Sequence, residues 1–336
     1  MNIVALERDK APNDPITTAR RWLDDFGEVA LATVVSTWGA APVPVGGQLV
    51  VAPNEHFEGS VSGGCVEADV IAEAVEIMGA SRPKLLEFGV AEETAWRAGL
   101  PCGGRIEILL DPLKRERDAE FLDQILAARS TREPVALIID VATGDRRLVF
   151  NSDAPLEIAS CLEVGESRLI DMPEGRTFVN ALIPPVRVVV AGATHVGQML
   201  AALARQIGYE VMVIDPRAAF ASKERFGAIE LLTGWPETSL ATVRLDKRTA
   251  VVALTHASHI DDEALTAALR SPCFYIGALG SKRTHANRIE RLKAAGFSEA
   301  DVARVYAPVG LAIGAKGPAE IAVSILAEII KVARGA

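Results

Sequence analysis

The sequence predicts an α/β protein with two domains. We expect an N-terminal α/β domain with a mixed sheet at residues 1–183 and a C-terminal Rossmann-like domain with a doubly wound parallel sheet at residues 186–336. Three observations support this prediction. The length of 336 residues exceeds that of one ordinary domain. Pro184-Pro185 reads as a boundary, and from Val186 onward apolar strands alternate with helices, as in doubly wound parallel sheets.

Composition narrows the classes of function. Charged residues interrupt every apolar stretch before it reaches membrane-spanning length, so we expect no membrane span. The formal net charge is -9 without a basic stripe, which argues against nucleic acid as a partner. The first residues, MNIVALERDKAPND, lack the features of a secretory signal, so we expect a cytoplasmic protein. The four cysteines are widely separated and do not resemble a disulfide framework.

The elements of the first half follow from periodicity and turn residues. Residues 15–27 read as a helix that stops at Gly27, and residues 29–39 read as a buried strand. Further segments are expected as two short strands around Pro53-Asn54, a helix at 66–79, a strand at 104–111, a helix at 114–130, a hairpin around 143–145 and a last strand at 175–185.

The stretch SVSGGCVE, residues 60–67, places Cys65 at the junction of a strand and a helix. A helix N-terminus favours a thiolate or a bound phosphate, and glycines at 63 and 64 remove the side chains that would block close approach. The alternative is a small buried cysteine that fills the core. A second loop, Cys102-Gly103-Gly104, repeats the device in mirror order. We therefore favour a site that both cysteines share.

The second half opens with a strand, a glycine turn, a helix and a second strand that ends at Asp215. Gly192 and Gly197 fill the outer places of the G-x-G-x-x-G fingerprint, while Thr194 occupies the middle one. That threonine either repels a pyrophosphate or offers its hydroxyl to it. Asp215 lies at the spacing expected for a contact to a ribose hydroxyl, although many such turns merely pack a helix on a sheet.

Polar residues also follow the strands of TAVVALTHASHIDD and CFYIGALGSKRTHANR, where doubly wound sheets bind ligands. His195, His256 and His259 would meet Asp261, Ser281 and Lys282 at this edge. Three histidines beside a carboxylate raise the hypothesis of a metal site, against the alternative that they hydrogen-bond to backbone. The chain closes with a glycine-rich loop and a long, mostly apolar helix.

These motifs together resemble the XdhC/CoxI family, the accessory proteins of xanthine dehydrogenase and related molybdenum hydroxylases. The resemblance covers nearly the whole chain. It rests on GSVSGGCVE and GLPCGGRI in the first half, and on GATHVG, DPR, THASHID, YIGALGS and PVGLAIGAKGPAEIAVSILAEI in the second. It implies an accessory chaperone, favoured over an enzyme, that binds molybdenum cofactor, as molybdopterin or its mononucleotide or dinucleotide form. Such a protein assists sulfuration of the cofactor and its insertion into a xanthine dehydrogenase or CO dehydrogenase type of hydroxylase.

The resemblance also implies partners and site residues. The partners are an apo molybdenum hydroxylase and a cysteine desulfurase, and a homodimer is left open. The residues that match the family pattern are Cys65, Glu67, Cys102, His195, Asp215, Arg217, His256, Asp261 and Ser281. The loops around them add further expected cofactor contacts at Gly63, Gly64, Gly103, Gly104, Gly192, Thr194 and Gly197. Cys65 and Cys102 are the expected contacts to molybdenum, and no catalytic residue is expected.

Three positions depart from the family pattern. Thr194 replaces a glycine of the turn, and Ala257 replaces an aspartate after the histidine. Ala40 and Val43 stand where the family has serine and arginine, so a guanidinium suited to clamp a phosphate is missing.

Two other classes of function remain open. The first is an NAD(P)-dependent oxidoreductase, suggested by the glycine turn and Asp215. The second is a thiol redox protein that uses Cys65 and Cys102 as a reversible disulfide.

Overall fold

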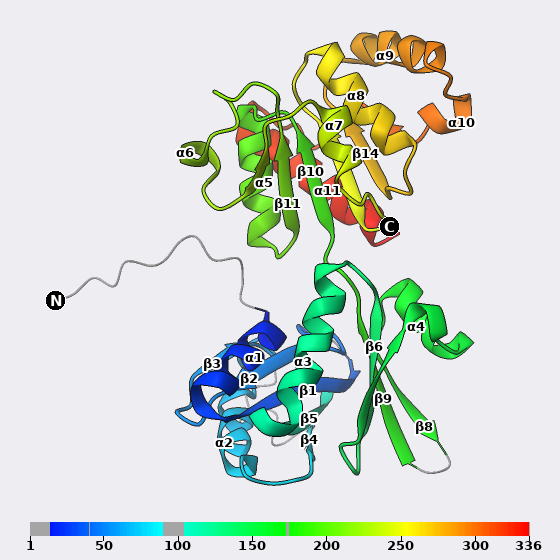
Figure 1. Cartoon of the computed structure of the whole chain (residues 1–336). Coiled ribbons are helices and arrows are strands. Elements are labelled where there is room, and N and C mark those ends of the chain that lie inside the picture. The colour runs from blue at the N-terminus through cyan, green and yellow to red at the C-terminus, as the bar shows by residue number, and fades with distance from the viewer. Residues whose placement is uncertain (1–13, 40, 90–103, 173–174, 336) are drawn as a thin grey trace, which may run out of the picture. The chain divides into compact units, whose positions relative to one another are not determined.

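The computed structural model describes residues 14–335, apart from residues 40, 90–103 and 173–174 (Figure 1). The chain divides into two compact units, one that ends at Pro184 and one that begins at Pro185. We call them the N-terminal unit and the C-terminal unit. No helix among the described residues is long and apolar enough to cross a membrane.

The N-terminal unit contains two sheets. The first has five strands in the order β3-β2-β1-β5-β4, and the second has four in the order β7-β6-β9-β8. Their bounds are β1 Glu28–Trp38, β2 Gln48–Val51, β3 Phe57–Gly59, β4 Lys84–Phe88, β5 Arg105–Lys114, β6 Val135–Asp140, β7 Arg146–Phe150, β8 Arg168–Met172 and β9 Gly175–Leu182. The helices of this unit are α1 Pro15–Phe26, α2 Glu67–Ile77, α3 Arg115–Ser130 and α4 Leu156–Val164, with a 3-10 turn at Asn151–Asp153.

The predicted α/β class is confirmed, but the sheets of this unit differ in pairing from the expected mixed sheet. Every pairing between its described strands is antiparallel. Where neighbouring strands follow one another along the chain, as at the predicted turn around Gly144, a short connection reverses the chain and gives antiparallel pairing.

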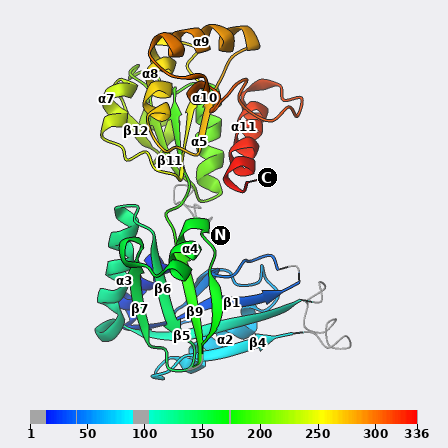
Figure 2. The ribbon, with the colours of Figure 1, turned by 90° about the vertical axis from the view of Figure 1, so that its right-hand side faces the viewer.

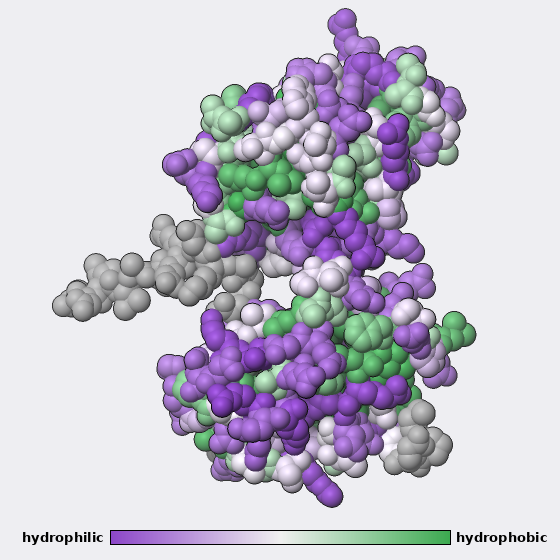
Figure 3. Space-filling model, in the orientation of Figure 1, coloured by the Kyte–Doolittle hydropathy of each residue, from purple (hydrophilic) through white to green (hydrophobic). Residues whose placement is uncertain are grey.

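Alternation along β1 explains how one sheet forms two cores. Leu31 and Val35 face α1, α3 and the second sheet, whereas Ala32 and Val34 face α2. Hydrophilic residues cover much of the outer face of the unit on which α3 lies (Figure 3). The first sheet therefore lies between layers, and α2 is held against it by Val70, Ala74 and Ile77.

The C-terminal unit is a parallel sheet with helices on both faces. Its strand order is β12-β11-β10-β13-β14-β15, the order typical of dinucleotide-binding folds, and all its pairings are parallel. The strands are β10 Arg187–Ala191, β11 Glu210–Ile214, β12 Glu230–Leu232, β13 Thr249–Ala253, β14 Tyr275–Ala278 and β15 Val305–Tyr306. The helices are α5 His195–Gln206, α6 Lys223–Phe226, α7 Pro236–Ala241, α8 Ser258–Leu269, α9 Lys282–Ala294, α10 Glu299–Val302 and α11 Gly317–Ala333. The predicted Rossmann-like domain is confirmed.

Two apolar clusters hold the helices on this sheet. Val188 and Val190 face α5 and α11, while Val189 and Ala191 face α7 and α8. Figure 2 shows α5 and α11 on one side of the sheet and α7 and α8 on the other. The ligand-binding edge of such a sheet lies at the carboxyl ends of its strands, where β10, β11, β13 and β14 release the chain into loops.

Two of the four cysteines have packing roles. Cys161 lies buried on α4, and Cys273 lies buried before β14. Burial raises the pKa of the Cys273 thiol, which favours its neutral form. Neither side chain is exposed to a ligand.

Candidate functional site

The loop before α2 is built around the carboxylate of Glu67. One carboxylate oxygen accepts hydrogen bonds from the hydroxyl of Ser60 at 2.7 Å and from the backbone N–H of Ser62 at 2.9 Å. The other accepts from the N–H of Gly64 at 2.8 Å and from the hydroxyl of Ser62. The N–H groups of Val61 and Gly63 also point to this side chain, at 3.2 and 3.1 Å. Glu67 therefore fixes the course of the whole loop.

This arrangement sets the charge of Glu67. Burial alone would raise its pKa, but the hydrogen bonds from Ser62, Ser60 and the backbone outweigh burial and lower the pKa from 4.5 to about 2. The N–H groups of Cys65 and Val66 donate to the Ser62 hydroxyl at 2.9 and 3.0 Å. The expectation that this loop offers its N–H groups to a phosphate is therefore wrong, because its own side chains already use them.

Cys65 is exposed at the end of this loop, which Glu67 holds in place. Gly63 and Gly64 adopt left-handed backbone angles, with φ of 79° and 114°, which side chains would disfavour. The alternative that Cys65 fills the core is wrong, since its side chain is open to solvent while Val66 beside it is buried. The structure thus presents one thiol on a loop whose shape a carboxylate sets.

Residues 41–47 form a loop that lies next to the Cys65 loop. A side chain at Gly63 would lie 3.3 Å from Pro42. At the other end of the same connection, a side chain at Gly39 would lie 3.4 Å from the Cα atom of Gly104. Cys102 and Gly103 lie outside the described residues. Gly104, the described residue that follows them, therefore lies against the segment between β1 and β2. The Cys65 loop lies against the same segment.

The strand ends next to Gly104 enclose a hollow of about 850 Å³ that sequence reasoning missed. Its lining includes Ser36, Trp38, Glu87, Gly104, Arg105 and Glu107. Arg105 is the cation of this hollow and pairs with Glu87 at 2.6 Å. Val43, which replaces the family's arginine, packs instead against the core beneath α2. The signal that could have found it is Trp38 followed by Gly39 at the end of the predicted strand.

In the C-terminal unit, the glycine turn is closely packed. A side chain at Gly192 would lie 2.8 Å from the Thr255 side chain, and one at Gly197 would lie 2.3 Å from the carbonyl oxygen of Gly192. Thr194 is the N-cap of α5, and its hydroxyl accepts the N–H of Gly197 at 3.1 Å. Thr194 therefore serves the helix itself, and close packing favours glycine at both positions, as does the φ of 124° at Gly192.

Asp215 is fully buried, and its hydrogen bonds join the glycine turn after β10 to the loop after β11. Its Oδ2 accepts the N–H of Ala193 at 2.8 Å and Nη2 of Arg217 at 2.7 Å. Its Oδ1 accepts the N–H and Nε of Arg217 at 3.0 and 2.8 Å. Burial alone would raise its pKa, but these bonds outweigh burial and lower it below its ordinary value. Asp215 thus fixes Arg217, whose guanidinium also stacks over Phe220 at 4.2 Å.

In the loop after β13, a buried carboxylate again accepts hydrogen bonds from the loop. Asp261 is buried and accepts the N–H and hydroxyl of Thr255 at 3.0 and 2.6 Å. Burial raises the pKa of this carboxyl above its ordinary range. The buried guanidinium of Arg288, another residue that sequence reasoning missed, lies 3.9 Å from it. Between Thr255 and Asp261 the backbone places His256 in the left-handed region, at φ 61°, with its side chain exposed.

Ser281 caps α9 by accepting the N–H of Thr284 at 3.1 Å. His195 is exposed at the first residue of α5, and His259 is exposed on α8. No group of three or more His, Cys, Asp or Glu side chains within the described ranges is arranged to hold a metal ion. The metal hypothesis for these histidines therefore finds no ligand set.

The predicted site residues thus fall into two groups. Glu67, Thr194, Asp261 and Ser281 bond to backbone close to them in the chain, and Asp215 bonds to the backbone of the glycine turn as well as of its own loop. A second group has side chains at the surface, where they can contact a ligand: Cys65, His195, His256 and the partly exposed Arg217. The internal carboxylates build the loops, and the exposed side chains are the candidates for contact.

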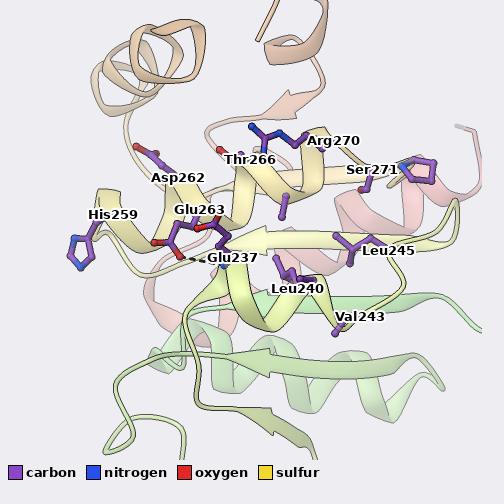
Figure 4. Close-up of a pocket in the computed structure, with 13 residues that line it drawn as sticks. Glu237, Leu240, Val243, Leu245, His259, Asp262, Glu263, Thr266, Arg270 and Ser271 are labelled. Carbon is purple, nitrogen blue, oxygen red and sulfur yellow. Dashed lines mark hydrogen bonds between the residues drawn. The ribbon is translucent and has the colours of Figure 1, made fainter. Parts of the chain in front are cut away.

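A further hollow, of about 740 Å³, lies between α7 and α8 (Figure 4). Leu240, Val243 and Leu245 line one side of it. Two of its acidic side chains have internal partners: Glu263 accepts the N–H of Glu237 at 3.3 Å, and Asp262 pairs with Arg291. None of the described residues predicted to contact a cofactor lines this hollow. We therefore do not place the candidate site there.

Comparison with known proteins gives consistent matches over both units. A model described as the XdhC Rossmann domain matches residues 188–329, and a model described as the XdhC and CoxI family matches residues 22–89. The chain is 32% identical over 303 residues to "Molybdenum cofactor insertion chaperone PaoD" of Escherichia coli, covering 90% of this chain and 82% of that protein. It is 29% identical over 320 residues to a Bacillus subtilis protein described as a probable xanthine dehydrogenase subunit, covering 92% of this chain and 94% of that protein.

A solved structure supports the fold. A crystal structure described as a xanthine dehydrogenase from Bacillus halodurans superposes with a TM-score of 0.76 at 24% identity, over 96% of each chain. At this identity the likeness concerns the fold alone.

Proposed function

Because the chain belongs to the XdhC and CoxI family, we propose that it is a maturation factor that binds molybdenum cofactor as cargo and delivers it to a molybdenum hydroxylase. The relative named as a molybdenum cofactor insertion chaperone supports this role over most of both chains. We further propose that a cysteine desulfurase supplies sulfur to the cofactor while it is bound.

The observation that carries the proposal is the exposed thiol of Cys65 on a loop fixed by Glu67. A thiolate is a soft ligand of the kind suited to sulfur-rich metal centres. A ligand loop that is fixed before binding loses little conformational entropy when cargo arrives. Cys65 is therefore suited to reversible contact with molybdenum.

The residues around the Cys65 loop fit the remainder of the cargo. The cofactor brings a metal with sulfur ligands, a flat pterin and a phosphate. Arg105 supplies a cation in the hollow of the N-terminal unit, and Trp38 supplies an aromatic surface. The chain's own task is to hold and orient the cargo, and to release it when the client binds.

The proposal is tested by measuring transfer of the cofactor from this protein to an apo hydroxylase. Full-length protein is purified from a host that makes molybdopterin and is mixed with a purified apo hydroxylase of the xanthine dehydrogenase type. We expect hydroxylase activity to appear in proportion to the protein added, and the pterin to move to the hydroxylase on gel filtration. Activation by free cofactor alone at the same rate, with none from the loaded protein, would contradict delivery.

The rival oxidoreductase function makes a separate prediction. Both oxygens of Asp215 already accept two hydrogen bonds each, and the side chain is fully buried, so it is not placed to accept a ribose hydroxyl. The Thr194 hydroxyl accepts an N–H of the helix that would face a pyrophosphate. We therefore expect calorimetric titration with NADH and NADPH to show no binding in the micromolar range. Micromolar or tighter binding of either nucleotide would favour the oxidoreductase.

A further inference from the structure

Trp38 is an aromatic side chain that stands in water at the end of β1. It exposes 75% of its surface. Its partner across the sheet is Arg105. Gly39, which follows it, and Gly104, which precedes Arg105, carry no side chains, so the strand ends pass close together without covering the indole. An indole left open beside a hollow offers a flat surface on which a ring can stack.

The wall of the same hollow is polar and charged. Glu107 is buried and held by Arg176, with 2.7 Å between Nη2 and Oε2. Glu87 lies directly opposite Glu107 on β4 and is about half exposed. Glu87 is therefore the carboxylate of this wall that solvent reaches, while Glu107 and Arg176 brace the sheet behind it.

This hollow and the Cys65 loop share one connection. The segment that begins at Gly39 beside the hollow continues to Pro42, which lies against Gly63.

We propose that Trp38 is the stacking surface for the pterin ring of the cargo, and that Glu87 accepts hydrogen bonds from the amino edge of that ring. The inference rests on the proposed function and assigns its recognition to named side chains. A pterin is a flat heteroaromatic ring with adjacent N–H donors on one edge, and a carboxylate is the natural acceptor for such a pair. Arg105, paired with Glu87 at 2.6 Å, orients that carboxylate.

The test uses full-length protein from a host that cannot make molybdopterin, with 6-carboxypterin as the probe in equilibrium dialysis. We expect Trp38→Ala to weaken binding by roughly tenfold or more, since stacking of a base on an aromatic side chain has an effect of that size. Trp38→Phe should retain part of the affinity, and Glu87→Gln should weaken binding of the probe. Trp235→Ala is the matched control, because Trp235 is 48% exposed in the C-terminal unit, and it should bind as wild type does.

The melting temperature of each variant is measured alongside, and it should stay near that of the wild type because the Trp38 side chain is mostly in solvent. Equal affinity of Trp38→Ala and wild type, or no binding of the probe by the wild type, would overturn the assignment. Pterin content after co-production with the molybdopterin pathway separates the two claims. Cofactor retained equally by wild type and Trp38→Ala overturns the stacking surface alone, whereas no cofactor in the wild type overturns the proposed function.

Discussion

Glu67→Gln is expected to destabilise the N-terminal unit by about 2–3 kcal/mol, the order of magnitude for losing several charge-assisted hydrogen bonds at a partly exposed site. The neutral amide is a weaker acceptor, and its NH₂ group would replace one of the two oxygens and so face the N–H donor of either Ser62 or Gly64 instead of accepting from it. Chemical denaturation monitored by circular dichroism measures the loss. We expect the loop to lose its fixed course, and cofactor retention to fall with it.

The same residue predicts a dependence on pH. The pKa of Glu67 in the folded protein is about 2, below its ordinary value of 4.5. The stabilisation is therefore fully present above about pH 4.5 and is lost as the pH falls toward 2. Wild-type protein should lose stability over this window by more than Glu67→Gln does.

Glu76→Gln is the matched control for both measurements, because Glu76 is an exposed glutamate on the same helix. It should follow the wild type at every pH. If Glu67→Gln and Glu76→Gln unfold alike, the carboxylate does not organise the loop.

Cys65→Ala is expected to leave stability unchanged within about 0.5 kcal/mol, because the side chain is exposed, and to lower cofactor retention by roughly tenfold or more. The thiol is the group that contacts molybdenum in our account, so its removal acts on the cargo and leaves the fold intact. Retained pterin per chain and thermal melting are measured on the same preparation.

Cys161→Ala separates the loss of an exposed thiol from the loss of a buried one. Cys161 is buried on α4, so this variant should lower the melting temperature without a direct effect on the cargo. Normal retention of cofactor by Cys65→Ala would remove Cys65 from the site.

Much of the fold could be predicted from local signals. The helix Pro15–Phe26 has a proline at its start and Gly27 at its end, and Asp14 caps it as such residues do. The run from Arg187 to Ile214 shows the strand, turn and helix periods clearly. Elements without such signals were not foreseen: β4 is a half-exposed edge strand of five residues, and α4 begins at Leu156, which is 87% exposed.

The site was predictable in its residues but not in their roles. The sequence marks Glu67, Asp215 and Asp261 as acids near glycine turns, yet which donors a carboxylate meets depends on how the backbone folds around it. Exposure is likewise set by distant neighbours. Trp38 stands open beside glycines at 39 and 104, which the sequence separates by 64 intervening residues and the sheet brings together.

The most direct test of the central claim is the pterin content of wild-type protein purified from a host that makes molybdopterin. Acid oxidation releases the pterin as a fluorescent product, and mass spectrometry of the native protein gives molybdenum on the same sample. The account predicts about one pterin per chain, as a single site requires, with molybdenum present in the same proportion. Protein that carries neither pterin nor molybdenum after co-production with the whole biosynthetic pathway would contradict it.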